Sequence, residues 1–393
     1  MTMRQNLICT IGTSLLYPNL AQLPKTQETY GAWLAKQPLE DREFLKFDLI
    51  DQLHKANMES NIQNIARLLI QIPAQVRVCG AEINSVDLLH LNGEIPSDCN
   101  VFLFYSDTPD GNKACKIIET YFKFQGYQVN EPIKIENLTD DNPKLFRTKG
   151  LRNLAKEICQ ILRSQGVNYS SINATGGYKA QIAVAVLIGQ ALGVPVYYKH
   201  ERFNEIISFP PMPISLDFEL WLKTSGWLMN LEKENQLISF EELAEDWDEQ
   251  FETLVEHIDI DGKDFLILSA TGQIYLDTFK GKFESDRDQI LPPAVNQKCE
   301  PHLTDHSWGN ARDNILNFLN KIVNNFSYVY NCRTHYWNPD LSSQTLFRLR
   351  GDEIEGIYSN GSWTVKFFIE TSAITPGQKK ACVADLNYQL IKD

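Results

Sequence analysis

Hydrophobic and polar positions follow two alternating periods along the first 217 residues. Helical spacing marks residues 111–125 and the run that follows Gly177 and stops at Gly193. Strands that alternate with helices predict an α/β domain with a doubly wound parallel sheet. The apolar runs typical of buried strands are NLICTIGTSLL (6–16), QVRVCG (75–80), CNVFLFYS (99–106), SSINAT (170–175) and VPVYYKH (194–200).

The proline-rich segment 208–217 interrupts this pattern and predicts that the first domain spans 1–217. Residues 218–283 are predicted to form a small winged-helix-like linker domain, with helices at 218–231 and 239–257 and a hairpin within 264–279 turned at Thr271-Gly272. Residues 284–393 are predicted to form a compact α+β domain, with a helix at 311–326, strands at 346–351 and 356–370, an Asn-Gly turn and a closing helix from Gly377.

The composition is typical of a globular protein with two or three domains. The chain has 393 residues, of which 43% are hydrophobic and 22% charged. A net charge of -13 argues against broad binding to long nucleic acid, which needs a basic face, so an anion site has to be local. Scattered cysteines, no signal-peptide pattern and no apolar run of membrane length predict a reduced, cytoplasmic protein with no membrane partner.

Thr10-Ile11-Gly12-Thr13-Ser14 is the first candidate phosphate-binding segment, here named the first cradle. Gly12 lets the backbone approach a phosphate closely, and Thr13 and Ser14 offer hydroxyls and backbone N–H donors. Buried strands also end in Gly-Thr-Ser as a simple helix cap, and the segment alone does not separate the two interpretations.

The second cradle is Asn173-Ala174-Thr175-Gly176-Gly177-Tyr178-Lys179. Its glycine pair joins a strand to a helix, and Lys179 falls in the first helical turn, where the helix dipole disfavours a cation unless an anion binds there too. A solvated lysine beside a tight turn is the alternative. Both cradles follow strands, and ligands of a doubly wound sheet bind outside the carboxyl ends of strands. Arg147 and Lys149, in the segment 146–150, fit the edge of this site or a solvated loop equally well.

Cofactor and metal patterns are weak. Gly-x-Gly-x-x-Gly is missing after the first strand, and no acidic ribose clamp follows at the usual distance, so we expect no nicotinamide or flavin cofactor. We also expect no metal, because the spacing of the zinc-ligand types matches no strong finger pattern; they are Cys299, His302, His306, Cys332 and His335.

Five segments, taken in order, resemble the CRISPR-associated Rossmann-fold (CARF) proteins of type III systems: ICTIGTSLL, CGAEINSVDLL, LFYSDTPDGNKACKIIETYF, NATGGYKAQIAVAVLIGQALGVPVYYKHE and ISFPPMPISLD. The resemblance covers residues 6–217 and implies a Rossmann-like domain. It further implies that a homodimer binds a cyclic oligoadenylate, commonly cyclic tetra-adenylate, through the loops Gly12–Ser14 and Thr175–Lys179. An isologous dimer presents two copies of one cradle, which matches a ring of repeated phosphates.

The C-terminal region lacks the marks of two effectors common among CARF relatives. No arginine is followed four to six residues later by histidine, as in a HEPN ribonuclease, and no Glu-x-Lys follows an acidic strand residue, as in a restriction-type nuclease. Residues 310–393 instead resemble RelE/HigB-type mRNA interferases, in which cationic side chains promote metal-free cleavage of mRNA on the ribosome. Possible RNA-cleaving residues are Arg348 and Arg350, among the wider candidates Arg333, Lys366, Lys379 and Lys380, all of which fit surface charge equally well.

One departure from the interferase pattern stands at Glu370-Thr371-Ser372-Ala373, where such toxins usually have a dibasic pair. A carboxylate there repels RNA phosphate, which indicates a degenerate interferase. The sequence therefore favours a ring nuclease, in which ribose 2′-hydroxyls attack adjacent phosphates, Lys179 stabilises the phosphorane, and Thr13 or Ser14 orients the oxygen.

Two alternatives stay open, as does the ring size. The first is a ring-activated mRNA interferase that acts on ribosome-bound mRNA. The second is a DNA-binding regulator that uses residues 218–283, which their acidic composition disfavours.

Overall fold

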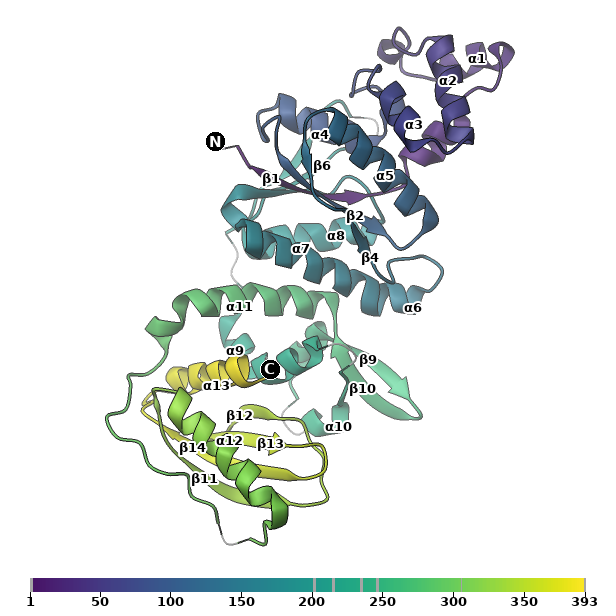
Figure 1. Cartoon of the computed structure of the whole chain (residues 1–393). Coiled ribbons are helices and arrows are strands. Elements are labelled where there is room, and N and C mark those ends of the chain that lie inside the picture. Colours follow the sequence, from purple (N-terminus) through teal and green to yellow (C-terminus); the bar gives the residue numbers. More distant parts are fainter. Residues whose placement is uncertain are drawn as a thin grey trace. The chain divides into compact units, whose positions relative to one another are not determined.

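The computed structural model describes residues 3–200, 203–213, 216–233, 236–244, 247–304 and 306–391. The chain divides into two compact units (Figure 1), with unit 1 formed by Met1–Ser215 and Ser269–Ile274 and unit 2 by Leu216–Leu268 and Tyr275–Asp393. The segments predicted as a linker domain and as a RelE-like domain thus fall together in unit 2, apart from 269–274. Within the described residues, no helix is long and apolar enough to cross a membrane.

Unit 1 is built on a seven-stranded sheet in the order β3-β2-β1-β5-β6-β7, with β4 beside β2. Its described pairings are parallel except that of β6 with β7. This arrangement confirms the predicted mixed α/β fold with a mainly parallel sheet. The strands are β1 (Asn6–Ile11), β2 (Asn100–Ser106), β3 (Gln128–Val129), β4 (Ile133–Ile135), β5 (Ser170–Asn173), β6 (Val196–Tyr198) and β7 (Ile207–Phe209).

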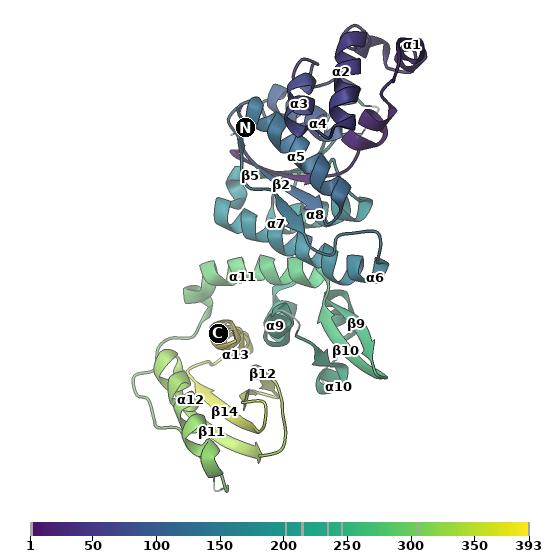
Figure 2. The same cartoon turned by 45° about the vertical axis from the view of Figure 1, so that its right-hand side comes forward.

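Helices cover both faces of this sheet, with α4 and α5 on one side and α7 and α8 on the other (Figures 1 and 2). Leu7 and Cys9 of β1 belong to the core shared with α2 to α5, whereas Ile8 belongs to the core shared with α7 and α8. Burial on both faces explains why β1 is mostly apolar, with only Asn6 and Thr10 polar. The helices are α1 (Gln27–Leu34), α2 (Phe47–Met58), α3 (Ile62–Leu69), α4 (Ala81–Leu91), α5 (Pro109–Phe124), α6 (Pro143–Leu145), α7 (Leu151–Gln165) and α8 (Lys179–Leu192).

The strand predicted at 75–80 is wrong, because Arg77–Cys79 form a single turn of 3₁₀ helix. Val78 and Cys79 are buried in the core, which explains the strand-like hydrophobicity of the segment. The Arg77 N–H, however, donates to the Asp41 carboxylate at 2.9 Å and has no neighbouring strand to pair with. Gly80, at φ 90°, then leads the chain into α4.

Unit 2 begins with α9 (Phe218–Glu232), which confirms the first helix predicted there. The helix predicted at 239–257 is wrong. Asp248 and Glu252 would repel each other one turn apart in such a helix, as would other acidic pairs in this segment. Its described residues form β8 (Ile238–Ser239), α10 (Phe240–Leu243), a 3₁₀ segment (Glu249–Leu254) and the start of β9 (Val255–Ile260).

The hairpin predicted within 264–279 is also wrong, since its turn lies earlier, between β9 and β10 (Lys263–Leu268). Asp261 and Gly262 form this turn with positive φ angles of 53° and 78°. Asp-Gly is a strong signal for a two-residue hairpin because it tolerates such backbone angles. Gly272 instead belongs to the first turn of α11 (Ala270–Ile290), where its N–H donates to Ser269 Oγ at 2.9 Å.

The remainder of unit 2 is a four-stranded antiparallel sheet in the order β11-β14-β13-β12. Two helices, α12 (Arg312–Asn325) and α13 (Pro376–Leu390), share a core with Phe347 and Phe367 of the sheet. These elements confirm the predicted α+β arrangement, including the hairpin around Asn360-Gly361 and the closing helix. The strands are β11 (Val329–Asn338), β12 (Leu346–Arg350), β13 (Glu353–Ser359) and β14 (Thr364–Thr371).

Candidate functional site

The two cradles lie at the carboxyl ends of adjacent parallel strands. β1 leads into the first cradle and β5 into the second, and Cys9 pairs with Asn173 in register. From β1 the chain builds β2 on one side and later β5 and β6 on the other, so β1 and β5 flank the topological switch point of the sheet. Doubly wound sheets bind their ligands at this point. The structure thus brings both predicted segments to the place where a ligand is expected.

The glycines of the two cradles are required because the loops touch. A Cβ added to Gly12 would lie 2.5 Å from the Gly177 nitrogen, and one added to Gly176 would lie 2.6 Å from the Gly12 nitrogen. The Thr10 hydroxyl donates to the Gly176 carbonyl at 2.6 Å and ties the loops together. Close packing of the backbone therefore explains these glycines without a ligand.

Glu82, in the first turn of α4, occupies the space beneath both loops. Its carboxylate accepts the Gly12 N–H at 2.8 Å and the Ser14 hydroxyl at 3.1 Å. The residue is only 1% exposed. Burial raises the pKa of this carboxyl, while the hydrogen bonds from Gly12 and Ser14 oppose that rise. Two donors that the sequence assigned to a phosphate thus bind an acidic group of the protein itself.

Asn173 and Thr175 face inward and hold the second cradle in place. The Asn173 amide donates to the Ser85 hydroxyl at 2.8 Å, and the Thr175 hydroxyl donates to the Asn173 side-chain oxygen at 2.6 Å. The Thr175 oxygen also accepts the backbone N–H of Lys199 at 3.0 Å. Both side chains are buried. Their hydrogen bonds position the loop. Contact with a ligand in solvent is therefore made by other groups of the cradles.

Thr13 and Lys179 are the cradle side chains that remain available. Lys179 is exposed and begins α8, and Thr13 is half-buried. Within the described residues, neither the Lys179 ammonium nor the Thr13 hydroxyl has a hydrogen-bond or ion-pair partner. Gly177, two residues before Lys179 in the second cradle, is also exposed and has a φ of 100°. The outer surface of the two cradles therefore offers one cation and one hydroxyl to a ligand.

Tyr178 links the second cradle to the segment 146–150. Its ring packs edge-on against Phe146, with the ring centroids 5.2 Å apart. Arg147 and Lys149 are exposed on the same short turn. The structure therefore places these two cations on a segment that contacts the second cradle.

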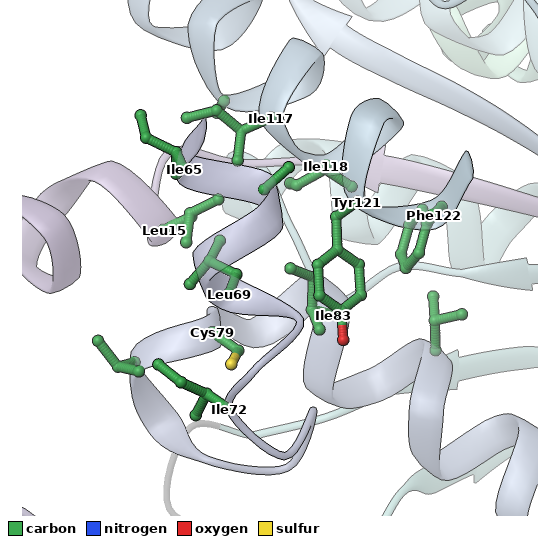
Figure 3. Close-up of a cluster of buried hydrophobic side chains, with 14 of the residues drawn as sticks. Leu15, Ile65, Leu69, Ile72, Cys79, Ile83, Ile117, Ile118, Tyr121 and Phe122 are labelled. Carbon is green, nitrogen blue, oxygen red and sulfur yellow. The ribbon is translucent and has the colours of Figure 1, made fainter. Parts of the chain in front are cut away.

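Leu15 anchors the first cradle in the core of unit 1. Figure 3 shows its side chain among Ile65, Leu69 and Ile118. A Cβ added to Gly80 would lie 3.1 Å from that of Leu15, so the first cradle also packs on the residue that precedes α4. This packing holds the loop next to the helix that carries Glu82.

A second polar cluster lies on the C-terminal sheet of unit 2. Successive side chains of a strand point to opposite faces, so Arg348, Arg350 and Glu355 point away from the core that contains Phe347 and Ile354. We call this surface the polar face; its residues are Arg333, His335, Tyr336, Arg348, Arg350, Glu355, Lys366 and Phe368.

Glu355 is the centre of the polar face, and its side chain is 0% exposed. It accepts hydrogen bonds of 2.9 Å from Arg348 Nε and from Arg350 Nη1. Burial raises the pKa of this carboxyl, but the two guanidinium groups outweigh burial, and the pKa falls below its ordinary value. Glu355 is therefore ionised at neutral pH and holds both arginines.

His335 joins the polar face through an irregularity of β11, whose register against β14 shifts beside it. Its ring stacks on Phe368, with centroids 4.2 Å apart. Its Nε2 lies 2.9 Å from Glu355 Oε1, although the two atoms are not aligned for a hydrogen bond. Burial lowers the pKa of His335; the Glu355 carboxylate opposes this shift, and Arg350 and Lys366 add to it. The imidazole is thus neutral at neutral pH.

Arg333 and Lys366 complete the cations of the polar face. Arg333 lies over the Phe368 ring and binds Glu370 at 3.2 Å, so the anion that seemed to replace a cation in the sequence is neutralised. The Lys366 ammonium lies 5.1 Å from the centre of the Tyr336 ring.

The remaining cationic candidates are engaged elsewhere. Lys379 donates to the Asp352 carbonyl at 2.7 Å, and Lys380 pairs with Glu219 on α9. Within the part of the chain that is described, no group of three or more His, Cys, Asp or Glu side chains could hold a metal ion. Cys299 is exposed, whereas Cys332 is buried in the core, where burial raises the pKa of its thiol.

Neither buried carboxylate, Glu82 or Glu355, was predicted from the sequence. For Glu82 the signal is weak, because Asn84, Ser85 and Asp87 follow it closely and make its helix polar at several positions. For Glu355 the signal is stronger, because arginines and acids alternate on either side of Gly351-Asp352 and pair in register, Arg348 with Glu355. His335 was considered only as a zinc ligand.

Comparison with known proteins gives two findings. A family model described as "CRISPR-associated protein (Cas_APE2256)" matches residues 77–212. The solved structure of Can2 from Sulfobacillus thermosulfidooxidans in complex with cyclic tetra-adenylate (cA4) is 11% identical, with 76% of this chain and 70% of that chain covered and a TM-score of 0.24. The family match includes Glu82, β5, the second cradle and α8, and it relates this part of unit 1 to CRISPR-associated proteins.

Proposed function

We propose that this protein is a ring-responsive ribonuclease: unit 1 binds a cyclic oligoadenylate at the two cradles, and the polar face of unit 2 cleaves RNA. The observation that carries the catalytic part is the convergence of His335, Arg348 and Arg350 on the buried Glu355. The observation that supports ring binding is the position of the cradles at the switch point, with Lys179 available there.

The polar face supplies the groups that RNA cleavage by an internal 2′-hydroxyl needs. The neutral His335 takes the proton of the 2′-hydroxyl as its oxygen attacks the adjacent phosphorus. Arg350, whose side chain is 58% exposed, reaches the phosphate and stabilises the negative charge that develops. The bond to the 5′ oxygen breaks, and this oxygen takes a proton from water. The products are a 2′,3′-cyclic phosphate and a 5′-hydroxyl.

Glu355 is a positioning residue in this scheme, because no part of its side chain reaches solvent. Its charge fixes the two arginines, and its proximity to His335 Nε2 favours the tautomer that keeps the proton there, which leaves Nδ1 to act as the base. Ring binding controls the reaction only if the ring binds the active and inactive states with different affinities.

The ligand proposed for unit 1 is a ring because the CARF resemblance implies a two-fold homodimer, which would repeat each cradle. Lys179 and Thr13 then recur on both sides of a symmetric anion. Arg147 and Lys149 extend the same surface with two further exposed cations. A ribosome-bound mRNA is the macromolecular substrate that the interferase resemblance implies.

A second candidate function is cleavage of the ring itself. It is favoured by the Thr13 hydroxyl and the Lys179 ammonium, which have no partner among the described residues and lie on two touching loops. Lys179 would stabilise the phosphorane, and Thr13 or, after release from Glu82, Ser14 would orient an oxygen. Purified protein incubated with labelled ring in EDTA tests this function: an intact ring, or cleavage by Lys179→Ala at the wild-type rate, contradicts it.

A translating extract tests the ribonuclease. We expect messenger RNA to be cut only when the ring is added, also in EDTA, and we expect cutting to fall about a hundredfold or more in His335→Gln and Arg350→Ala. Glu353→Gln is the matched control, because Glu353 is an exposed partner of Arg333 at the rim of the polar face. Ring-independent cutting, or full activity of both variants, contradicts the proposal.

A further inference from the structure

A cavity of about 450 Å³ within unit 2 adjoins the polar face. One wall comes from α9, β8, α10 and Phe251. The other comes from residues 341–349 with parts of β13 and β14. Its size falls in the range of small-ligand pockets. The ribonuclease scheme described above makes no use of it.

The cavity combines aromatic and aliphatic walls with an acceptor that lacks a partner among the described residues. Trp227, Phe251 and Ile238 supply aromatic and aliphatic surface. Gln344 also lines it: its amide nitrogen donates to the Leu237 carbonyl at 3.1 Å, whereas its side-chain oxygen is buried and has no hydrogen-bond partner among the described residues. A buried acceptor without a donor is costly, so a ligand that brings an N–H group gains from binding here.

The cavity is continuous with the proposed catalytic surface. Arg348 and Lys366 belong to the polar face and also line the cavity. Lys223 and Glu242 line it as well, so charges of both signs stand around an apolar interior. A ligand that reaches from the cavity to Arg348 carries an anionic group outside and an apolar, N–H-bearing group inside.

We propose that this cavity binds a nucleobase of the RNA substrate, next to the phosphate that is cleaved at the polar face. This inference rests on the proposed ribonuclease. A nucleobase is flat enough to stack on an aromatic wall, carries N–H donors for the Gln344 oxygen, and is joined through its ribose to a phosphate within reach of the cations. Extruding one base from the strand also bends the backbone, which favours the in-line geometry that attack by the 2′-hydroxyl requires.

The test fills the mouth of the cavity and leaves the catalytic groups unchanged. Ser342 lines the cavity, is exposed, and is neither part of the polar face nor of the core. Ser342→Trp occupies the space, and Ser342→Ala is the matched control. Gln344→Met removes the acceptor at nearly constant volume, and circular dichroism of all three full-length variants verifies folding.

The substrates are short RNAs that differ in one nucleobase. In the first set, used for cleavage, the ribonucleotide beside the cleaved phosphate either carries its base or is abasic. The second set repeats this pair with a 2′-deoxy sugar at that position, which prevents cleavage, so that binding is measured by fluorescence anisotropy. For the wild type with ring, we expect loss of the base to weaken binding about tenfold, as for one stacked base. Ser342→Trp and Gln344→Met are expected to lose this dependence on the base, and Ser342→Ala to retain it.

The outcomes separate the two proposals. If the wild type cuts RNA but neither cutting nor binding depends on the base, the cavity proposal is overturned and the ribonuclease stands. If base-dependent binding is present in the wild type and absent in Ser342→Trp while no messenger RNA is cut in the translating extract with ring, the subsite stands and the ribonuclease is overturned. If base-dependent binding persists in Ser342→Trp, the base binds elsewhere and the cavity proposal is overturned.

Discussion

The backbone N–H of Gly12 donates to the buried carboxylate of Glu82 at 2.8 Å. A loop whose sequence is typical of a phosphate cradle is thus held by an acidic side chain that lies under it. The contact explains the geometry of the loop in the absence of a ligand, and it places a carboxyl group near the anion that the loop is proposed to bind.

Glu82→Gln tests the cost of the buried charge. Burial raises the pKa of Glu82 above its ordinary value of about 4.3. The folded protein therefore binds the proton of the Glu82 carboxyl more tightly than the unfolded chain does. Protonation of Glu82 stabilises the fold fully below about pH 4, and this stabilisation is lost as pH rises through the raised pKa. Since glutamine mimics the protonated acid, we expect the variant to be more stable than the wild type at pH 7.

Urea unfolding between pH 4 and pH 8 measures this difference, which is expected to shrink as the pH falls. Glu59→Gln is the control, because Glu59 is exposed. A gap between Glu82→Gln and the wild type that is constant over the whole range would show that the charge of Glu82 has no energetic cost.

Gly176→Ala tests the contact between the cradles. The new Cβ would lie 2.2 Å from Glu82 Oε1 and 2.7 Å from the Thr10 carbonyl oxygen, so the loops have to separate. We expect a loss of about 2 kcal/mol in the free energy of unfolding, as for overpacked cores. Gly31→Ala is the matched control: Gly31 lies in α1 with open space around it, and alanine there is expected to be neutral or slightly stabilising. Equal stability of the two variants would contradict the contact.

Lys179→Ala tests the anion site. The Lys179 ammonium has no partner within the described residues, so its removal is not expected to change the melting temperature. We expect the Kd for cyclic tetra-adenylate to rise about ten- to a hundredfold, as for the loss of a charge-assisted hydrogen bond. Isothermal titration calorimetry at two salt concentrations measures this effect and its electrostatic origin.

Lys116→Ala is the control for this experiment, because Lys116 is exposed on α5 and lies on neither cradle. Unchanged affinity of Lys179→Ala for rings of four and of six nucleotides would remove the reason to place the ligand at the cradles.

Glu355→Gln tests the organisation of the polar face. The pKa of Glu355 is lowered in the folded protein, so its stabilising effect is present above its ordinary pKa and lost as pH falls through the lowered one. We expect the variant to lose about 3 kcal/mol at neutral pH, the usual cost of removing one partner from a buried ion pair. The gap to the wild type is expected to close at acidic pH.

The same variant has a second readout in the pKa of His335, which the Glu355 carboxylate raises against the effect of burial. Without that charge, the pKa is expected to fall further, and the lower limb of the pH–rate profile is expected to move to lower pH. Nuclear magnetic resonance of the imidazole follows the shift directly. An unchanged His335 titration would show that the 2.9 Å approach to Glu355 has no electrostatic effect.

The core of unit 1 was predictable because its periodicities are local. Residues 6–11 and 100–106 are mostly apolar and form central parallel strands, and the run after Gly177 forms α8. The errors occurred where a local pattern competes with a tertiary one. Val78 and Cys79 are apolar and buried as in a strand but form a 3₁₀ turn, and the acidic run after Phe240 contains too many repelling pairs for one helix.

The candidate site was predictable only in outline. The sequence identifies Gly12, Gly176 and Lys179 as unusual from their immediate neighbours, because glycine and a cation at a helix start are local features. It does not show that Asn173 and Thr175 turn inward, since their hydrogen-bond partners are Ser85 of α4 and Lys199, which follows β6.

The sequence by itself determined the α/β fold of unit 1, the strand ends at which its loops lie, and the α+β fold that ends the chain, because hydrophobic period and turn residues act over a few positions. Tertiary structure alone decided that Glu82 binds a backbone N–H 70 positions away, and that His335 and two arginines meet at Glu355. Such contacts depend on how distant segments pack, and a buried charge is stable only where that packing supplies its donors.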